Sequence, residues 1–242
     1  GLVEAAVARG VRVGVMKPVA AGATRGAEGW RNEDAERLIT AARSTLPYDW
    51  VNPYCLPEPL SPHLAARTAG VALDLSTIQG YCERIAFEND WTLVEGAGGW
   101  LAPLNDTESI ADLARALDFP VLMIVGLRLG CLNHAQLTWH AIAASGCRRA
   151  GWIANGIDPS MMAVDANLQT LVERLGEAPM ATLPHGASPA ARRAALDSAR
   201  AATPIIGMLK RRVWAMISAS SAVSPELDRI SATSAAVNMP RS

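Results

Sequence analysis

Short apolar runs alternate with helical segments along most of this chain, and that alternation constrains the fold more than any other feature. Apolar residues at helical spacing predict helices over Leu75–Glu88, Glu108–Leu117, Leu132–Ala144, Ala163–Leu175 and Pro189–Ala201. Runs rich in valine, isoleucine and leucine predict strands at Val11–Met16, Trp91–Glu95, Val121–Gly126, Ala150–Ala154 and Pro179–Leu183. Because strands that are apolar on both faces need cover on both sides, the pattern predicts an α/β fold with a doubly wound, mostly parallel sheet.

The charge balance argues against nucleic-acid and membrane partners. A formal net charge of −1 over 242 residues gives no field that would attract polyanions, so a small-molecule substrate is expected. Glu4 and Arg9 interrupt any signal-peptide pattern, and no run reaches the roughly 18 apolar residues that a membrane span needs. The four scattered cysteines form no C-x-x-C pair, which fits neither a zinc site nor a disulfide framework. We therefore expect a cytoplasmic protein with reduced thiols.

The domain organisation predicted from the sequence is one domain and a tail. Residues 1–202 are expected to form the α/β domain, and residues 203–242 a divergent, flexible C-terminal tail, since seven of the last 25 residues are serine. The opening "GLVEAAVARG" predicts the latter part of an amphipathic helix that stops at Gly10. Capping-box patterns predict two further helix starts, one at Ser76 with Gln79 and one at Asn105 with Glu108.

Polar residues and glycines follow the predicted strands, where parallel sheets bind their ligands. The first strand ends on Lys17, although the chain has only two lysines against twenty arginines. The second strand ends in "EGAGG" from Glu95 to Gly99, the third in "GLRLGCLN", and the fourth in "NGIDP" from Asn155. One edge of the sheet therefore collects a lysine, a carboxylate, bare glycine backbone and an asparagine.

These residues allow a functional and a structural interpretation. Glu95 stands where P-loop proteins place a magnesium-binding acid, with Asp34 as the candidate second ligand; alternatively, Glu95 accepts amide hydrogens of the next turn while Asp34 or Asn32 caps a helix. The "GAGG" glycines could admit a phosphate or form a plain turn. The helix start at Cys131 could bind an anion, or Asn133 could simply cap it. The histidine spacing supports no metal site.

Six ordered motifs resemble those of the dethiobiotin synthetase family. They are "KPVAAG", "RNEDA", "VNPY" followed by "EPLSPHLAA", "LVEGAGGWLAPL", "VGLRLGCLNHA" and "GWIAN". The resemblance runs from residue 1 to about residue 200 and implies a P-loop NTPase-like fold. It also implies ATP-dependent carboxylation of 7,8-diaminopelargonate with CO₂ to dethiobiotin in biotin synthesis, through a carbamate and a carbamic-phosphoric anhydride. The family requires Mg²⁺ and works as a homodimer.

The resemblance implies a role for residues in each motif. Lys17 is similar to the lysine that stabilises the substrate carbamate, and Asp34 and Glu95 match the magnesium ligands. The implied ATP-binding residues are Asp34, Glu95, Gly96, Ala97, Gly98, Asn155, Gly156, Pro184, His185 and Gly186. The implied substrate-binding residues are Ala21, Gly130, Cys131, Leu132 and Asn133, of which the last four reach the substrate carboxylate from the neighbouring subunit.

The chain departs from the family pattern in its phosphate-binding residues. The 242 residues contain no G-x-x-x-x-G-K-[ST], so the family's first strand and P-loop are expected before residue 1, and this chain is expected to be a poor phosphoryl-transfer catalyst with a weakened sheet. Ala21 stands where the family commonly has a hydroxyl that contacts substrate. The alternatives are an inactive remnant that retains substrate binding or dimerisation, or a related ATP-dependent amide synthase of the same fold.

Overall fold

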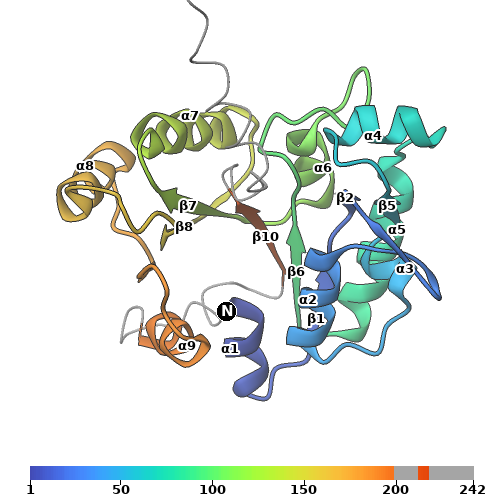
Figure 1. The fold of residues 1–242 in the computed structure, drawn as a ribbon, viewed down its shortest axis with the longest axis horizontal. Coiled ribbons are helices and arrows are strands. Elements are labelled where there is room, and N and C mark those ends of the chain that lie inside the picture. Colours follow the sequence, from blue (N-terminus) through green and yellow to red (C-terminus); the bar gives the residue numbers. More distant parts are fainter. Residues whose placement is uncertain (199–211, 218–242) are drawn as a thin grey trace, which may run out of the picture.

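The protein is built on a six-stranded parallel sheet, seen in a computed structural model that describes residues 1–198 and 212–217 (Figure 1). The strand order is β1-β6-β10-β7-β8-β9, and every neighbouring pair is parallel. The strands are β1 (Val13–Met16), β6 (Trp91–Glu95), β7 (Val121–Leu127), β8 (Arg149–Gly156), β9 (Ala181–Leu183) and β10 (Arg212–Ile217). The predicted α/β class and parallel sheet are thereby confirmed.

The helices largely follow the predicted ones. They are α1 (Leu2–Ala8), α2 (Glu33–Ala42), α3 (Tyr48–Val51), α4 (Pro62–Ala69), α5 (Leu75–Glu88), α6 (Ile110–Leu117), α7 (Cys131–Ala144), α8 (Val164–Leu175) and α9 (Pro189–Ser198). The end of the last predicted helix, residues 199–201, lies outside the described residues. Helix α2 was considered only as a helix capped by Asn32 or Asp34, without bounds, although its apolar residues gather on one face. Helices α3 and α4 were not predicted; α3 is a single turn, too short to show a repeating pattern. No helix in residues 1–198 has the length and hydropathy of a bilayer span.

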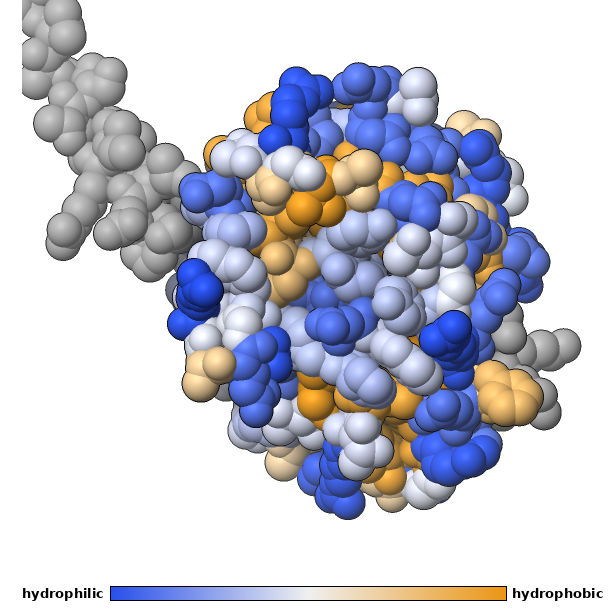
Figure 2. All heavy atoms as spheres, turned by 90° about the vertical axis from the view of Figure 1, so that its right-hand side faces the viewer, coloured by the Kyte–Doolittle hydropathy of each residue, from blue (hydrophilic) through white to orange (hydrophobic). Residues whose placement is uncertain are grey.

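Two hydrophobic cores lie on opposite faces of the sheet. On one face Met16, Val94 and Trp152 pack with helices α5 to α8. On the other face Val15 and Leu93 pack with α1, α2 and α9, of which α1 and α9 lie side by side below the sheet in Figure 1. Alternate residues of β1 and β6 therefore enter different cores, as the pleat of a strand requires. On the face that carries α4 and α5, hydrophilic residues surround several separate hydrophobic areas (Figure 2).

Strand β10 occupies the middle of the sheet, between β6 and β7. Its Val213 aligns with Leu93 of β6, and its Ala215 with Leu122 of β7. The prediction of a flexible tail from residue 203 therefore fails for residues 212–217. Residues 203–211 and 218–242 lie outside the described residues. The six described strands form one continuous sheet, and its weakening stays a prediction. The apolar run "VWAMI" is the sequence signal for this strand.

Two small sheets flank the segment that leaves β1. β2 (Val19–Ala21) pairs with β5 (Tyr54–Leu56) in parallel, and β3 (Thr24–Gly26) pairs with β4 (Gly29–Arg31) as a hairpin. These three-residue strands were not predicted, because they are too short to show an alternating pattern. They carry the chain from Lys17 to helix α2, which holds Asp34.

The helix caps differ from the predicted capping boxes. Helix α5 is capped by Asp74, whose carboxylate accepts from the amides of Ser76 and Thr77, so the predicted Ser76 box is wrong. Hydrogen bonding to these groups lowers the pKa of Asp74 to about 2. Asn105 and Glu108 do bond to each other, but in a turn that precedes α6, which is capped by a Ser109–Asp112 box. In both cases the cap is a residue close to the predicted one: Asp74 instead of Ser76 for α5, and Ser109 instead of Asn105 for α6.

We predict that Ala215→Pro destabilises the protein by about 3 kcal/mol, because proline in a central strand removes a ladder hydrogen bond and clashes with its neighbour strand. Ala215→Gly keeps the backbone N–H and is the matched control. The free energy of unfolding in urea measures both variants. Equal stability of the proline and glycine variants would show that β10 does not belong to the folded sheet.

Candidate active site

Lys17 lies at the carboxyl-end edge of the sheet, directly after β1, with its side chain between two carboxylates. Its Nζ is 2.7 Å from Glu95 Oε1 and 3.1 Å from Asp34 Oδ2. It also donates to the carbonyl of Gly96 at 3.2 Å. Strand pairing explains the first contact, since Met16 aligns with Val94 and the next residues along the two strands, Lys17 and Glu95, therefore lie side by side. The predicted grouping of Lys17, Asp34 and Glu95 is thus what the structure shows.

The ammonium group of Lys17 is buried yet charged. The residue is 6% exposed, whereas the Asp34 side chain is half exposed and that of Glu95 is 15% exposed. Burial works to lower the pKa of Lys17, but the charges and hydrogen bonds of Glu95 and Asp34 outweigh it, so the pKa is raised. Lys17 therefore keeps its proton at neutral pH and offers a fixed positive charge at a site with little water.

Asp34 reaches this cluster from the first turn of α2. Asn32 is the N-cap of that helix, and its side-chain oxygen accepts from the amides of Asp34 and Ala35 at 3.0 and 3.4 Å. Of the two residues considered for this cap, Asn32 holds it, which leaves the Asp34 carboxylate free to face Lys17. A carboxylate in the first turn is also favoured by the helix dipole.

A glycine-rich turn follows Glu95. Gly98 and Gly99 have φ of 76° and 113°, values that side chains rarely adopt. The bare backbone of Gly96, Ala97 and Gly98 thus lies beside the ion cluster. It can approach an anion closely, as expected from the sequence for a nucleotide.

The two segments predicted on the adenine side are brought together. Asn155 of β8 aligns with Leu183 of β9, which leads directly into Pro184, His185 and Gly186. Gly156 packs so closely on this turn that a Cβ atom there would lie 2.7 Å from the His185 amide nitrogen. The close approach of two backbones at the edge of the sheet explains why glycine is needed at position 156.

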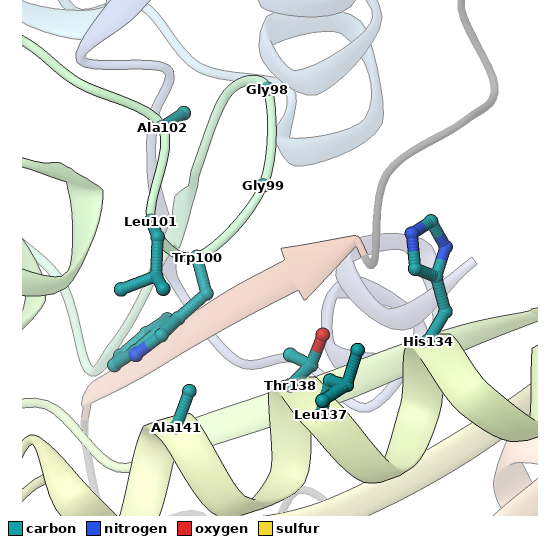
Figure 3. A pocket seen from close by; sticks show the side chains of 9 residues that line it. All are labelled: Gly98, Gly99, Trp100, Leu101, Ala102, His134, Leu137, Thr138 and Ala141. Atoms are coloured by element: carbon teal, nitrogen blue, oxygen red, sulfur yellow. The ribbon is translucent and has the colours of Figure 1, made fainter.

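Helix α7 begins with Gly130 as its N-cap, at φ of 90°, and Cys131, Leu132 and Asn133 form its first turn. Asn133 is therefore not the N-cap of α7, so the structural role considered for it in the sequence is wrong. A pocket of about 290 Å³ lies between this helix and the turn after β6. In Figure 3 the side chains of His134, Leu137 and Thr138 rise from α7 toward the Gly98–Ala102 segment.

The pocket and the ion cluster are neighbouring but separate features. The pocket is lined by Gly98, Gly99, Trp100, Leu101, Ala102, His134, Leu137, Thr138 and Ala141. Lys17, Asp34 and Glu95 are not among these residues, and neither is Ala21, whose carbonyl accepts from the Asn32 side chain at 3.4 Å. The pocket residues His134, Leu137 and Thr138 were not predicted from the sequence. Their spacing along one face of α7 is the available signal.

The carboxylates of the ion cluster are ligands of the kind that magnesium prefers. Both lie within 3.1 Å of Lys17 Nζ, which occupies the point that they share. No cluster of three or more histidine, cysteine, aspartate or glutamate side chains that could hold a metal occurs in the described part of the chain. Magnesium needs no such cluster, since it typically takes one or two carboxylates and completes its shell with phosphate oxygens and water. Asp34 and Glu95 are the residues that would hold it.

Comparison with known proteins assigns the class and then the family. The sequence model of a family described as "AAA domain" matches residues 1–189, which together with the parallel sheet defines a P-loop NTPase-like protein. The ATP-dependent dethiobiotin synthetase BioD of Xylella fastidiosa (strain 9a5c) is 49% identical over 177 residues, 73% of this chain and 78% of that protein. The protein of the same name from Xanthomonas oryzae pv. oryzae (strain PXO99A) is 49% identical over 174 residues, 72% and 78% of the two chains.

A third relative with this name, from Pseudomonas paraeruginosa (strain DSM 24068 / PA7), is 44% identical over 200 residues, 81% of this chain and 88% of that protein. The chain belongs to the dethiobiotin synthetase family, a family of ATP-dependent ligases.

We predict that Gly156→Ala destabilises the protein by roughly 1–3 kcal/mol, because the added methyl group would push the 183–185 backbone away. Gly80→Ala is the matched control: Gly80 lies inside α5, and no atom of the described residues comes within 4 Å of a methyl group added there. This change should therefore stabilise the protein by about 0.5–1 kcal/mol. Chemical denaturation measures both. A neutral Gly156→Ala would show that the two segments are not packed as described.

Proposed function

We propose that this protein carboxylates 7,8-diaminopelargonate with CO₂ and ATP and closes the ureido ring of dethiobiotin, a step of biotin synthesis. The observation that carries the proposal is the buried Lys17 ammonium, within 3.1 Å of both Glu95 and Asp34. Membership of the dethiobiotin synthetase family supports the choice of reaction. A fixed cation beside two carboxylates suits a reaction in which negative charge builds on a substrate next to a phosphate group.

The first step forms a carbamate. One amine nitrogen of the substrate attacks the carbon of CO₂, a C–N bond forms, and the nitrogen loses a proton to solvent. The carbamate carries a negative charge on its oxygens. Lys17 can donate to these oxygens, because an ammonium has three N–H donors that can rotate toward new acceptors while the nitrogen stays in place. When carbamate binds, Lys17 exchanges some of its bonds to Glu95, Asp34 and Gly96 for bonds to substrate.

The second step activates the carbamate and the third closes the ring. A carbamate oxygen attacks the γ-phosphorus of ATP and ADP leaves, giving a carbamic-phosphoric anhydride. The second amine then attacks the carbonyl carbon: a C–N bond forms, the C–O bond to phosphate breaks, and the nitrogen loses a proton to solvent. Magnesium, held by Asp34 and Glu95, would supply charge neutralisation on the phosphate oxygens. Lys17 would hold the carbamate in line, and the backbone of Gly96, Ala97 and Gly98 would approach the nucleotide.

We place the adenine-binding part of the site at the β8 and β9 ends. The segment from Asn155 to Gly156 offers a side-chain amide, and the turn from Pro184 to Gly186 packs directly against it. Amide groups can read the hydrogen-bonding edge of a base. The pairing of β8 with β9 supports this assignment because it unites the two segments at one edge of the sheet.

We also propose that the protein is a homodimer, in which Gly130, Cys131, Leu132 and Asn133 of one copy contact the substrate carboxylate in the other. Support comes from large apolar side chains that are exposed around this helix: Leu129 is 95% exposed, Leu137 60% and Leu101 68%. Apolar side chains grouped in this way are typical of interaction surfaces. The four cysteines, Cys55, Cys82, Cys131 and Cys147, form no disulfide in the described residues, and reduced thiols fit a cytoplasmic location.

A second candidate function is binding of the diamine without phosphoryl transfer. The observation that favours it is that Lys17 and the two carboxylates, which would face the diamine, already contact one another within the described residues. Calorimetric titration with diaminopelargonate and with ATP in separate experiments distinguishes the two candidates, because only the enzyme binds both.

We predict that any dethiobiotin that the protein forms from diaminopelargonate, ATP, Mg²⁺ and ¹³C-bicarbonate carries one ¹³C atom, with one ADP released per product. Lys17→Met should lower this rate by at least about a hundredfold, since it removes the charge that faces the carbamate. Mass spectrometry measures the product, and Arg37→Met, on the exposed face of α2, is the control for loss of a distant cation. Product formation that survives Lys17→Met would contradict the assigned role.

A further inference from the structure

The backbone of Lys17 is held by a different set of bonds from those that hold its side chain. After β1 ends, the Lys17 amide donates to the carbonyl of Val51 at 2.8 Å rather than continuing the main sheet. The Lys17 carbonyl accepts from Asn52 Nδ2 at 2.6 Å. Both main-chain groups of Lys17 are therefore tied to residues 51 and 52, at the end of helix α3.

Asn52 is a buried polar residue, 1% exposed, and its side chain is fully engaged. Its Nδ2 donates to the carbonyls of Lys17 and Tyr54, and its Oδ1 accepts from the hydroxyl of Tyr48 at 3.1 Å. The two carbonyl acceptors at Nδ2 and the hydroxyl donor at Oδ1 fix the orientation of the Asn52 amide. A buried amide in this state has one preferred position, because each lost bond would leave a polar group unpaired.

Tyr48 connects this amide to the helix that carries Asp34. Its hydroxyl accepts from the backbone N–H of Asn32 at 2.8 Å, and Asn32 caps α2. Burial, then the contact with Cys55, raises the pKa of Tyr48, so the phenol stays protonated and can donate to Asn52. The guanidinium of Arg31 lies 4.1 Å from the centre of the Tyr48 ring and holds the ring in place.

These bonds close a ring through the ion cluster. From the Lys17 carbonyl the ring passes through Asn52, Tyr48 and the cap of α2 to Asp34, and returns to Lys17 through the 3.1 Å ion pair. Lys17 and Asp34 are 17 residues apart and come from different elements, so their separation is set by what joins those elements. We propose that Asn52 and Tyr48 are positioning residues that set the distance between the Lys17 ammonium and the Asp34 carboxylate.

The distance between Lys17 and Asp34 should affect catalysis, and only this kinetic expectation rests on the proposed function. If carbamate and phosphate oxygens are held by Lys17 on one side and by a metal on Asp34 on the other, a small change in their separation misaligns the reacting atoms. Loss of Tyr48 or Asn52 should therefore lower kcat more than it changes the KM for ATP, because Asp34 is shifted rather than removed and neither residue lies in the segments assigned to adenine.

The test uses Tyr48→Phe, which removes one oxygen atom and leaves the ring in place. Since the chain has only two lysines, ¹⁵N-lysine labelling gives two side-chain NMR signals, and the one that Lys17→Arg abolishes belongs to Lys17. Tyr48→Phe should speed hydrogen exchange of the Lys17 ammonium about tenfold at constant pH, as expected when one hydrogen-bonded support is lost. The kcat for dethiobiotin should fall about tenfold, with the KM for ATP within about twofold of its original value.

Tyr54→Phe is the matched control. Its hydroxyl bonds to Asp74 at the start of α5 and reaches neither Lys17 nor Asp34, so the Lys17 signal should not change. A variant that only destabilises the fold lowers the free energy of unfolding but leaves the Lys17 signal of the folded protein unchanged. Asn52→Leu serves as a second variant with the same expected effect.

Unchanged Lys17 exchange in both Tyr48→Phe and Asn52→Leu would overturn the inference, whatever the substrate proves to be. Changed exchange together with no dethiobiotin formation by the original protein would instead support the positioning role and overturn the proposed function. Changed exchange together with a lower kcat supports both.

Discussion

The contact of the Lys17 ammonium with Glu95 and Asp34 underlies both the packing and the chemistry of this protein. A charge that is 6% exposed is stable only where opposite charges and hydrogen-bond acceptors compensate for lost water. Here the two carboxylates and the Gly96 carbonyl provide that compensation. The three charged groups come from the end of β1, the end of β6 and the first turn of α2, so the cluster also fixes how these elements meet.

The same arrangement explains how the fold produces a reaction site. Parallel pairing of β1 with β6 places Lys17 beside Glu95, and the β8–β9 pair places a second polar turn at the same edge of the sheet. The central position of β10 holds the two halves of the sheet together, because β6 and β7 are joined through it. The site that we propose, with the nucleotide at one end and the substrate at the other, needs this fixed spacing.

Much of the fold could be predicted from the sequence, and the exceptions have a physical reason. Five strands and the helices between them have apolar patterns long enough to be recognised in the sequence. Because the carboxyl ends of parallel strands lie at one edge of the sheet, the proximity of Lys17 and Glu95 could also be predicted. The three-residue strands β2, β3, β4 and β5 between Val19 and Leu56 could not be predicted, because they are too short to show periodicity. The supporting roles of Tyr48 and Asn52 arise only from long-range hydrogen bonds, which no local pattern encodes.

The role of Lys17 can be tested by observing the carbamate itself, without ATP. The protein mixed with diaminopelargonate and ¹³CO₂ should show a ¹³C NMR signal of a bound carbamate, because Lys17 offers a buried positive charge to its oxygens. We expect this signal to disappear in Lys17→Met while the protein remains folded. A bound carbamate signal of equal intensity in Lys17→Met would show that the cluster is a structural ion pair and that the reaction, if it occurs, is supported elsewhere.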